Sequence, residues 1–304
     1  MRLFSYRNRP VHLGPYPLER LTRQRSLPDL DRVTPMGALS FDDANPESLN
    51  HALARYAAMF DLVRDGAVNP KPGDVPSDPA ERARHLKAAG YYFDASMMAC
   101  CALPPQAVLA EPLRNPDVAA LGAELQLSHP KSFAAGLDMI LADVLESART
   151  VHGAVTADDP AHRHALVILI EYPREPRAGE PGCDWIGGTQ AQRAAVLAAQ
   201  TAVLLSTYLR MLGHCARAHS ATCSEVDLAK LAVGCGLVDA DGNNPYIGRR
   251  FGLAAVTTAF EVTADLPLAP RAAQRRWQSH GLAWWLGGSG RGQGFTRSAF
   301  NRAA

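Results

Sequence analysis

The chain has 304 residues, 47% hydrophobic content and a formal net charge of +1, which excludes a disordered protein and allows one large domain or two small ones. The small net charge conceals a pattern: residues 1–25 hold six arginines against one acid, residues 266–304 hold six arginines and no acid, and the part between them carries about −10. Arginines scattered among proline, glycine and tryptophan favour docking on an acidic body or a partner over binding of nucleic acid, which we do not expect as a partner.

The N-terminal residues contain no recognisable export signal. The stretch MRLFSYRNRPVHLGPYPLERL has neither a secretory apolar core of about 7–15 residues nor a twin-arginine pair. Its proline and arginine content predicts an extended arm over residues 1–45 that lies across another surface. We therefore expect a cytoplasmic protein.

Helical spacing begins after the arm. Between Pro46 and about Val63, hydrophobic residues recur at intervals of three and four, which predicts an amphipathic helix. The residues on its apolar side are Leu49, Leu53, Tyr56, Phe60 and Val63. A linker rich in proline, glycine and aspartate follows, to about Ser77.

A second helix and a strand complete the first half. Asp78-Pro79 supplies an N-cap and a proline at the first helical position, and Gly90 is predicted to end the helix. The next segment, YYFDASMMACCAL, has strand character, and Pro104-Pro105 stops it.

The second half repeats this alternation of helix and strand. A helix is predicted over residues 131–149, and the β-branched run HALVILIEY predicts a strand buried on both faces at residues 164–172. Thr189-x-x-Gln192 has the capping-box pattern and begins a long apolar helix that runs to Gly213. Its apolar part is shorter than the roughly 20 residues of a membrane span, so we expect a buried core helix and no membrane contact.

The last predicted elements are a short helix and a strand. Ser224-x-x-Asp227 caps a helix that runs to Gly234, and residues 251–263 form the strand. This order of elements predicts an α+β or α/β domain over residues 46–268, with helices around a central sheet.

A basic tail follows, over residues 269–304. It contains Trp277, Trp284 and Trp285, and its glycines match neither a dinucleotide fingerprint nor a P-loop. Exposed tryptophan and arginine are typical of interfaces. We expect the arm and the tail to pack against each other, against a second copy in a homo-oligomer, or against a partner subunit.

The six cysteines contain no C-x-x-C pair, which argues against an iron–sulphur cluster and against the common zinc sites. Cys215, His219 and Cys223 recur every four residues and would share one face if they lay on a helix. No fourth ligand accompanies them. Buried thiols without a metal are therefore the favoured interpretation.

Residues 190–268 contain an ordered set of motifs. A long helix bears TYLRMLGHCARAH, a short helix ends in AVGCGLVDADGNNPYIGRRFG, and a strand leads to TADLPL. The landmarks are Gly234, Gly236, Asp241-Gly242-Asn243, Tyr246, Gly248, Arg250 and Asp265-Leu266-Pro267-Leu268. This arrangement resembles the corrinoid-binding part of reductive dehalogenases and, more distantly, epoxyqueuosine reductases. The upstream segment GYYFDASMMACCALPP is similar to the helix–glycine–strand segment of the same family.

The resemblance implies a nitroreductase-like α+β sandwich with a central mixed sheet flanked by helices. It implies cobalamin as the cofactor and an organohalide as the substrate, with a tyrosine that protonates the product and an arginine that stabilises the phenolate. Tyr208 matches the tyrosine and Arg250 the arginine. The residues matched to the cofactor lining are His219, Ser220, Thr222, Asn243 and Tyr246.

Each of these positions also has an ordinary structural interpretation. Tyr208 would be a core aromatic whose hydroxyl is hydrogen-bonded, and Arg250 would pair with Asp239 or Asp241 in a solvated turn before a strand. Two departures from the family pattern favour this interpretation. The cysteine-rich iron–sulphur segment does not follow DLPL, and the usual Gly-Asn-Asp-Thr loop is replaced by HSAT.

Two functional hypotheses follow. One is an oxidoreductase without iron–sulphur clusters that binds a corrinoid or a flavin, is fed by an outside reductase and removes halide from organohalides. The other is a non-catalytic subunit that docks on a cluster-bearing partner. Some soluble family members carry two copies of the fold, the first of which is degenerate and binds no cofactor. This chain resembles that first copy.

Overall fold

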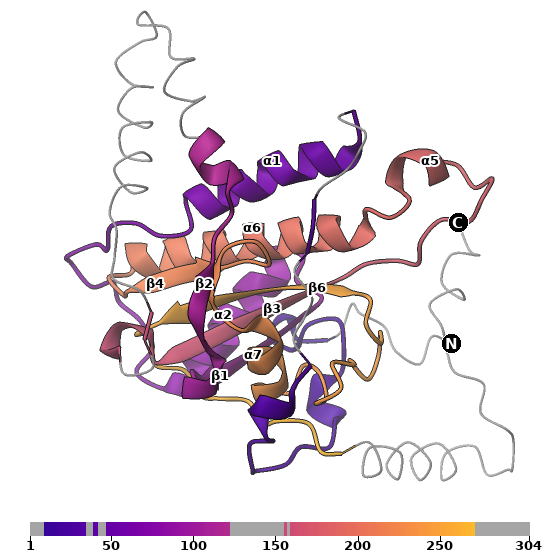
Figure 1. The fold of residues 1–304 in the computed structure, drawn as a ribbon. Coiled ribbons are helices and arrows are strands. Elements are labelled where there is room, and N and C mark those ends of the chain that lie inside the picture. The colour runs from indigo at the N-terminus through magenta and orange to yellow at the C-terminus, as the bar shows by residue number, and fades with distance from the viewer. Residues whose placement is uncertain (1–8, 35–38, 42–46, 122–154, 157–158, 271–304) are drawn as a thin grey trace, which may run out of the picture. The chain divides into compact units, whose positions relative to one another are not determined.

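The computed structural model describes residues 9–34, 39–41, 47–121, 155–156 and 159–270 (Figure 1). The helix predicted over residues 131–149 and the three tryptophans of the tail lie outside the described residues. Contacts group Met1–Leu268 into one compact unit.

A four-stranded antiparallel sheet lies at the centre of the fold. Its strands are β1 (Met97–Ala102), β3 (His164–Glu171), β6 (Phe251–Thr258) and β4 (Ala216–His219), in the order β1-β3-β6-β4. Each neighbouring pair is antiparallel, so the expected mixed sheet is wrong for the described strands. A second antiparallel pair joins β2 (Val108–Leu113) to β5 (Ser224–Val226). Separate helices around antiparallel strands make an α+β fold, as expected.

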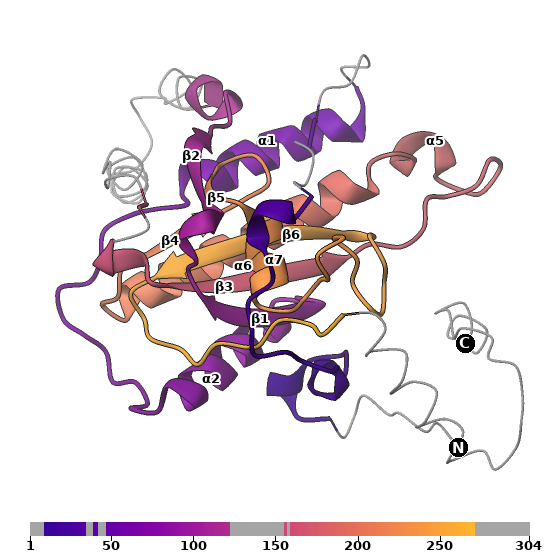
Figure 2. The ribbon, with the colours of Figure 1, turned by 60° about the horizontal axis from the view of Figure 1, so that its bottom comes forward.

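Helices cover both faces of the central sheet (Figures 1 and 2). The helices α2 (Pro79–Tyr92) and α6 (Gln190–Met211) pack on one face, and α1 (Leu49–Leu62) packs on α6. The short helix α7 (Leu228–Gly234) packs on the other face. A one-turn helix, α5 (Cys183–Ile186), precedes α6.

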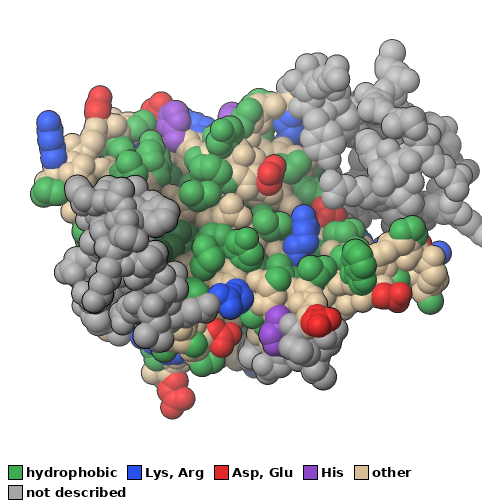
Figure 3. Space-filling view, turned by 90° about the horizontal axis from the view of Figure 1, so that it is seen from above, with side chains coloured by type: hydrophobic (Ala, Val, Ile, Leu, Met, Phe, Trp, Pro, Cys, Tyr) green, Lys and Arg blue, Asp and Glu red, His purple; other side chains and the backbone are tan. Residues whose placement is uncertain are grey.

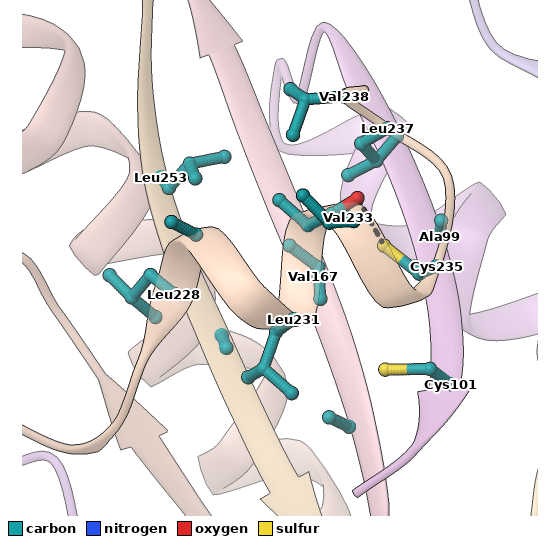
Figure 4. Packing of buried hydrophobic residues seen from close by; sticks show 14 of the residues in the cluster. Ala99, Cys101, Val167, Leu228, Leu231, Val233, Cys235, Leu237, Val238 and Leu253 are labelled. Carbon is teal, nitrogen blue, oxygen red and sulfur yellow. Dashed lines mark hydrogen bonds between the residues drawn. The ribbon is translucent and has the colours of Figure 1, made fainter. Parts of the chain in front are cut away.

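Strand β3 shows how the sheet divides the core into two clusters. Side chains alternate between the faces of a strand. Ala165, Val167 and Leu169 join the cluster under α7, where they meet Leu231 and Leu253 (Figure 4). The alternate residues of β3 join the cluster under α2 and α6. The prediction that this strand is buried on both faces is confirmed.

The long helix α6 lies unusually close to strand β6. Its inward side consists of small residues, among them Ala194, Ala198 and Ala202, all fully buried. A Cβ atom on Gly252 of β6 would lie 2.5 Å from the carbonyl carbon of Ala194. The two backbones therefore meet where neither has a bulky side chain. By length and composition α6 is the one described helix able to cross a membrane, and 67% of its most apolar window is buried inside the protein.

Local signals at the helix ends are partly as predicted. The Asp78 side chain caps α2, accepting from the backbone N–H of Ala80. Gly90 does not end α2, which continues to Tyr92; the glycine lies against Met98, where a side chain would clash.

The capping patterns of the second half are wrong. Thr189 makes no capping bond to α6, because its hydroxyl donates to the carbonyl of Ile186. Asp227 is itself the N-cap of α7, and Ser224 belongs to β5.

The described part of the arm packs on the chain's own body. Three short 3-10 helices, Val11–Leu13, Leu18–Arg20 and Leu30–Arg32, replace the expected extended chain. Leu18, Leu30 and Val33 enter the cluster under α7. The Arg23 guanidinium donates to the carbonyls of Gly236 (2.7 Å) and Leu266 (2.8 Å). The surface that the arm crosses is thus the body of the same unit.

The contact of α6 with β6 predicts a large effect of a single methyl group. We expect Gly252→Ala to lower the free energy of unfolding by about 1–3 kcal/mol, because the new Cβ displaces the helix backbone. Gly234→Ala is the control, since its Cβ would lie 3.7 Å from Leu27, an ordinary contact. Urea unfolding of both variants measures the difference, and equal midpoints would contradict the prediction.

Candidate functional site

The residues matched to the proton-donor pair lie at opposite ends of α6. Tyr208 is near the C-terminal end of the helix, while Arg250 precedes β6, whose Gly252 abuts Ala194 and Ala195 near the N-terminal end. A rise of 1.5 Å per residue separates Ala195 from Tyr208 by about 20 Å. The predicted pairing of Tyr208 with Arg250 is therefore wrong. Tyr208 is not a core aromatic either, because it is half exposed.

Ser220 and Thr222 hold a buried carboxylate of α1. Both hydroxyls donate to Asp61 at 2.6 Å, and the side-chain amide of Asn115 donates to it at 2.8 Å. Burial raises the pKa of Asp61, and the three hydrogen bonds oppose that shift. The two hydroxyls expected to line a cofactor are thus engaged within the fold.

His219 belongs to a buried chain of hydrogen bonds. The backbone N–H of Glu225 donates to its Nδ1 (3.3 Å), so its Nε2 carries the proton and donates to Thr257 Oγ1 (2.8 Å). Thr257 in turn lies 2.9 Å from His162 Nδ1. Burial lowers the pKa of both histidines, which keeps them neutral.

The position of His219 also shows that the Cys215, His219 and Cys223 spacing is not a helical one. His219 ends strand β4 and is not on a helix, so Cys215, His219 and Cys223 do not share a helix face as considered above. The described residues contain no group of three or more histidine, cysteine or acidic side chains that could hold a metal ion.

An ionic network lies next to the hydrogen-bonded residues His219, Thr257 and His162. The sequence analysis did not predict this network. The Glu225 carboxylate accepts from Arg64 (2.6 Å), from Arg217 (2.8 Å) and from Arg114 (3.1 Å). Arg217 also pairs with Asp65 (2.7 Å). Burial opposes ionisation of Glu225, yet the arginines outweigh it and lower its pKa to about 2. No local sequence pattern predicts the network, because its residues come from separate parts of the chain.

A small pocket opens beside the network. Asp65, Asp159, His162, Arg210 and Cys215 contribute to its lining, and its volume is about 140 Å³. Sites for small organic ligands usually enclose about 300–1,000 Å³. This pocket therefore suits a few waters and is too small for a corrinoid.

The remaining two matched residues lie in the loop between α7 and β6. The backbone N–H of Asn243 donates to Asp239 (2.8 Å), which closes the turn. The Tyr246 hydroxyl donates to the carbonyl of Pro17 (2.9 Å), and its ring lies 5.4 Å from that of Tyr16. The arm therefore contacts Tyr246, which remains 37% exposed.

Asn244, which the sequence analysis missed, anchors this loop from inside. Its buried amide donates to the carbonyl of Leu237 (2.7 Å) and accepts from the backbone N–H groups of Tyr246 and Ile247. Of the two arginines that follow, Arg250 accepts at its backbone carbonyl from the N–H of Tyr172 (3.1 Å). Arg249 donates to the carbonyl of Asp241 (2.7 Å).

The residues matched to a corrinoid site do not fit that group. Ser220 and Thr222 are bonded to Asp61, His219 is fully buried, and Tyr246 is hydrogen-bonded to the arm. Tyr208 and Arg250 are too far apart to act on one substrate. The arrangement is that of a polar core that holds α1, β4 and the central sheet together.

The polar core makes a prediction about acid stability. The folded-state pKa of Glu225 (about 2) lies below the ordinary value near 4.3, so its contribution is complete above about pH 5 and is lost as the pH falls toward 2. We expect Glu225→Gln to lower the free energy of unfolding by about 3–5 kcal/mol at pH 7, because Arg64 and Arg217 lose their counter-charge.

The difference between wild type and Glu225→Gln should shrink steadily below pH 5. Glu180→Gln is the control: this glutamate also pairs with an arginine, Arg174 (2.6 Å), but on the surface, where such pairs contribute little. Chemical denaturation between pH 3 and pH 8 measures both variants. A difference that does not change with pH would contradict the assignment.

Comparison with known proteins identifies the family. No protein-family model and no curated protein sequence matches the chain. Solved structures match it well. The N-terminally tagged catabolic reductive dehalogenase NpRdhA is 37% identical with a TM-score of 0.64, over 89% of this chain and 32% of that chain.

Two further structures give the same result. NpRdhA in complex with 3-bromo-4-hydroxybenzoic acid is 36% identical (TM-score 0.64), and a reductive dehalogenase whose structure suggests a mechanism for B12-dependent dehalogenation is 36% identical (TM-score 0.63). Each match covers 89% of this chain and 32% of the other. The chain thus spans about a third of the length of these relatives. It is a relative of the reductive dehalogenases, as its own motifs predicted.

Proposed function

We propose that this chain is a non-catalytic half of a reductive dehalogenase. In this proposal it keeps a nitroreductase-like version of the α+β fold, binds no corrinoid, and docks on a cofactor- and cluster-bearing partner. The observation that carries the proposal is that Ser220, Thr222, His219 and Tyr246, all matched to the cofactor lining, make hydrogen bonds inside the fold.

The polar core explains why these positions remain polar without a ligand. Buried polar groups must be hydrogen-bonded, because leaving one without a partner costs about 1–3 kcal/mol. Asp61 requires the two hydroxyls, and Thr257 requires His219. A corrinoid that competed for these groups would leave Asp61 with fewer partners in a buried site. The residues are thus retained for the fold.

The length of the relatives supports a role as one part of a larger assembly. This chain matches 32% of NpRdhA, so two thirds of such a dehalogenase has no counterpart here. We propose that this remainder supplies the cobalamin and the clusters, and that the present chain supports it without contacting the organohalide.

A specific observation supports one alternative function. A matching structure belongs to a B12-dependent dehalogenase, so a corrinoid-binding oxidoreductase is the competing function. It would require Tyr208 and Arg250 to meet across about 20 Å of helix. It would also require an outside source of electrons, since the cysteines show no cluster-binding spacing.

Reconstitution distinguishes the two functions. The purified 304-residue chain is incubated anaerobically with hydroxocobalamin and a reductant, desalted and examined by absorbance, with NpRdhA treated in parallel. We expect NpRdhA to retain cobalamin and this chain to retain less than about a tenth of an equivalent, because its matched side chains are engaged internally. Iron and acid-labile sulphide should be absent from the chain.

Stoichiometric cobalamin in the desalted chain would overturn the proposal and favour the corrinoid enzyme. In that case Ser220→Ala and Thr222→Ala should lower retention if these hydroxyls line the site. If these hydroxyls only bond Asp61, the same two substitutions should lower the free energy of unfolding and leave cobalamin retention unchanged.

A further inference from the structure

Exposed apolar side chains are concentrated on three helices. Fifteen large hydrophobic residues are exposed among the described residues, and eight of them lie on α1, α5 and α6. These eight are Leu49, Tyr56, Met59, Trp185, Ile186, Leu204, Tyr208 and Met211. Scattered exposed apolar residues are ordinary, but a concentration on one set of elements marks an interaction surface.

The outward side of α6 has the composition of a buried side. Leu204, Tyr208 and Met211 are spaced by four and three residues, so they form one stripe along the helix, and all three are exposed. From residue 194 to residue 211 the helix contains a single charged side chain, Arg210, which is buried and donates to the carbonyl of Ala216. A solvated helix face normally carries charges.

Helix α1 extends the same surface. The sequence predicted that Leu49 and Tyr56 face the core, but both are exposed, while Ala57 and Ala58 are buried on the opposite side. Met59 is exposed as well. Seen from above, hydrophobic side chains gather over this part of the molecule, between sparse charged groups (Figure 3). The predicted inward stripe of α1 is therefore partly an outward one.

Within α1 and α6, the exposed charged side chains are basic. The exposed ionisable residues of the two helices are His51, Arg55 and Arg193, and no acidic residue of either helix is exposed. Association of two identical copies through this face would bring the same cations together. The cations of α1 and α6 therefore favour a different protein that has an apolar centre and acidic groups opposite these two helices.

We infer that the α1–α6 face, defined as Tyr56, Met59, Leu204, Tyr208 and Met211, is the docking site for the cofactor-bearing part of a reductive dehalogenase. This inference rests on the proposed function, which supplies the partner. Tyrosine and methionine are enriched at interface centres, where a few side chains carry most of the binding energy. The unmatched two thirds of the relatives provides a body of sufficient size to cover the face.

The test uses the full chain and, as probes, the intact cobalamin-loaded, cluster-bearing reductive dehalogenases encoded by the same genome. Binding is measured by interferometry, and size by light scattering. We expect a one-to-one complex with one of these enzymes. Leu204→Glu and Met211→Glu should each weaken it about 30-fold or more, as expected for central interface residues. Arg55→Glu should mainly slow association at low salt.

Tyr92→Glu is the matched control, because Tyr92 on α2 is more exposed (79%) than Met211 (65%) but lies outside the face. It should leave the affinity within about threefold. All the variants are at exposed positions, and circular dichroism and melting temperature verify that each is folded.

The outcomes separate the two ideas. Binding that Leu204→Glu and Met211→Glu do not weaken overturns the docking face and leaves the proposed function standing. A wild-type chain that binds none of the enzymes overturns both. A homodimer that Met211→Glu dissociates would assign the face to a second copy and overturn the partner named here.

Discussion

The close contact between α6 and β6 determines where most other elements lie. A helix packs this near a strand only where both surfaces are small, and here Ala194 and Ala195 meet Gly252. Once α6 is placed, its inward side covers one face of the sheet and α1 packs on α6. The same contact puts Tyr208 and Arg250 at opposite ends of the helix. A constraint of packing therefore separates the two residues that the motifs matched to one catalytic pair.

A second constraint is the satisfaction of buried polar groups. Asp61, Glu225 and His219 lie inside the protein, and each is matched by donors or acceptors from distant parts of the chain. Burying a charge without a partner is far more costly than burying a paired one. The arginines and hydroxyls around these groups are thus required by the fold, and their resemblance to ligand-binding residues follows from the same chemistry.

These two constraints give the molecule an unusual distribution of polarity. Polar side chains are drawn inward to the network that contacts α1, whereas several large apolar side chains of α1 and α6 are exposed. The arm contacts the loop at Tyr246. In this relative of the reductive dehalogenases, the polar interior and the exposed apolar side chains are the two features on which the proposed supporting role rests.

The sequence by itself determined the long elements and the family. Strong local patterns identify the strand predicted at residues 164–172, the N-cap at Asp78 and the long helix predicted to run to Gly213, and the motifs after residue 190 indicate the reductive dehalogenases. The strands β4 and β5 were missed, because four and three wholly buried residues show no alternation.

Only the tertiary structure decided what the polar residues do and which side of each helix is covered. Ser220 and Asp61 are 159 residues apart in the chain, and no local pattern links them. Leu49 and Tyr56 lie on the apolar side by spacing, yet α1 buries its alanines against α6 instead. Hydrogen-bond partners and packing neighbours are long-range properties, so local periodicity specifies a helix without specifying what it meets.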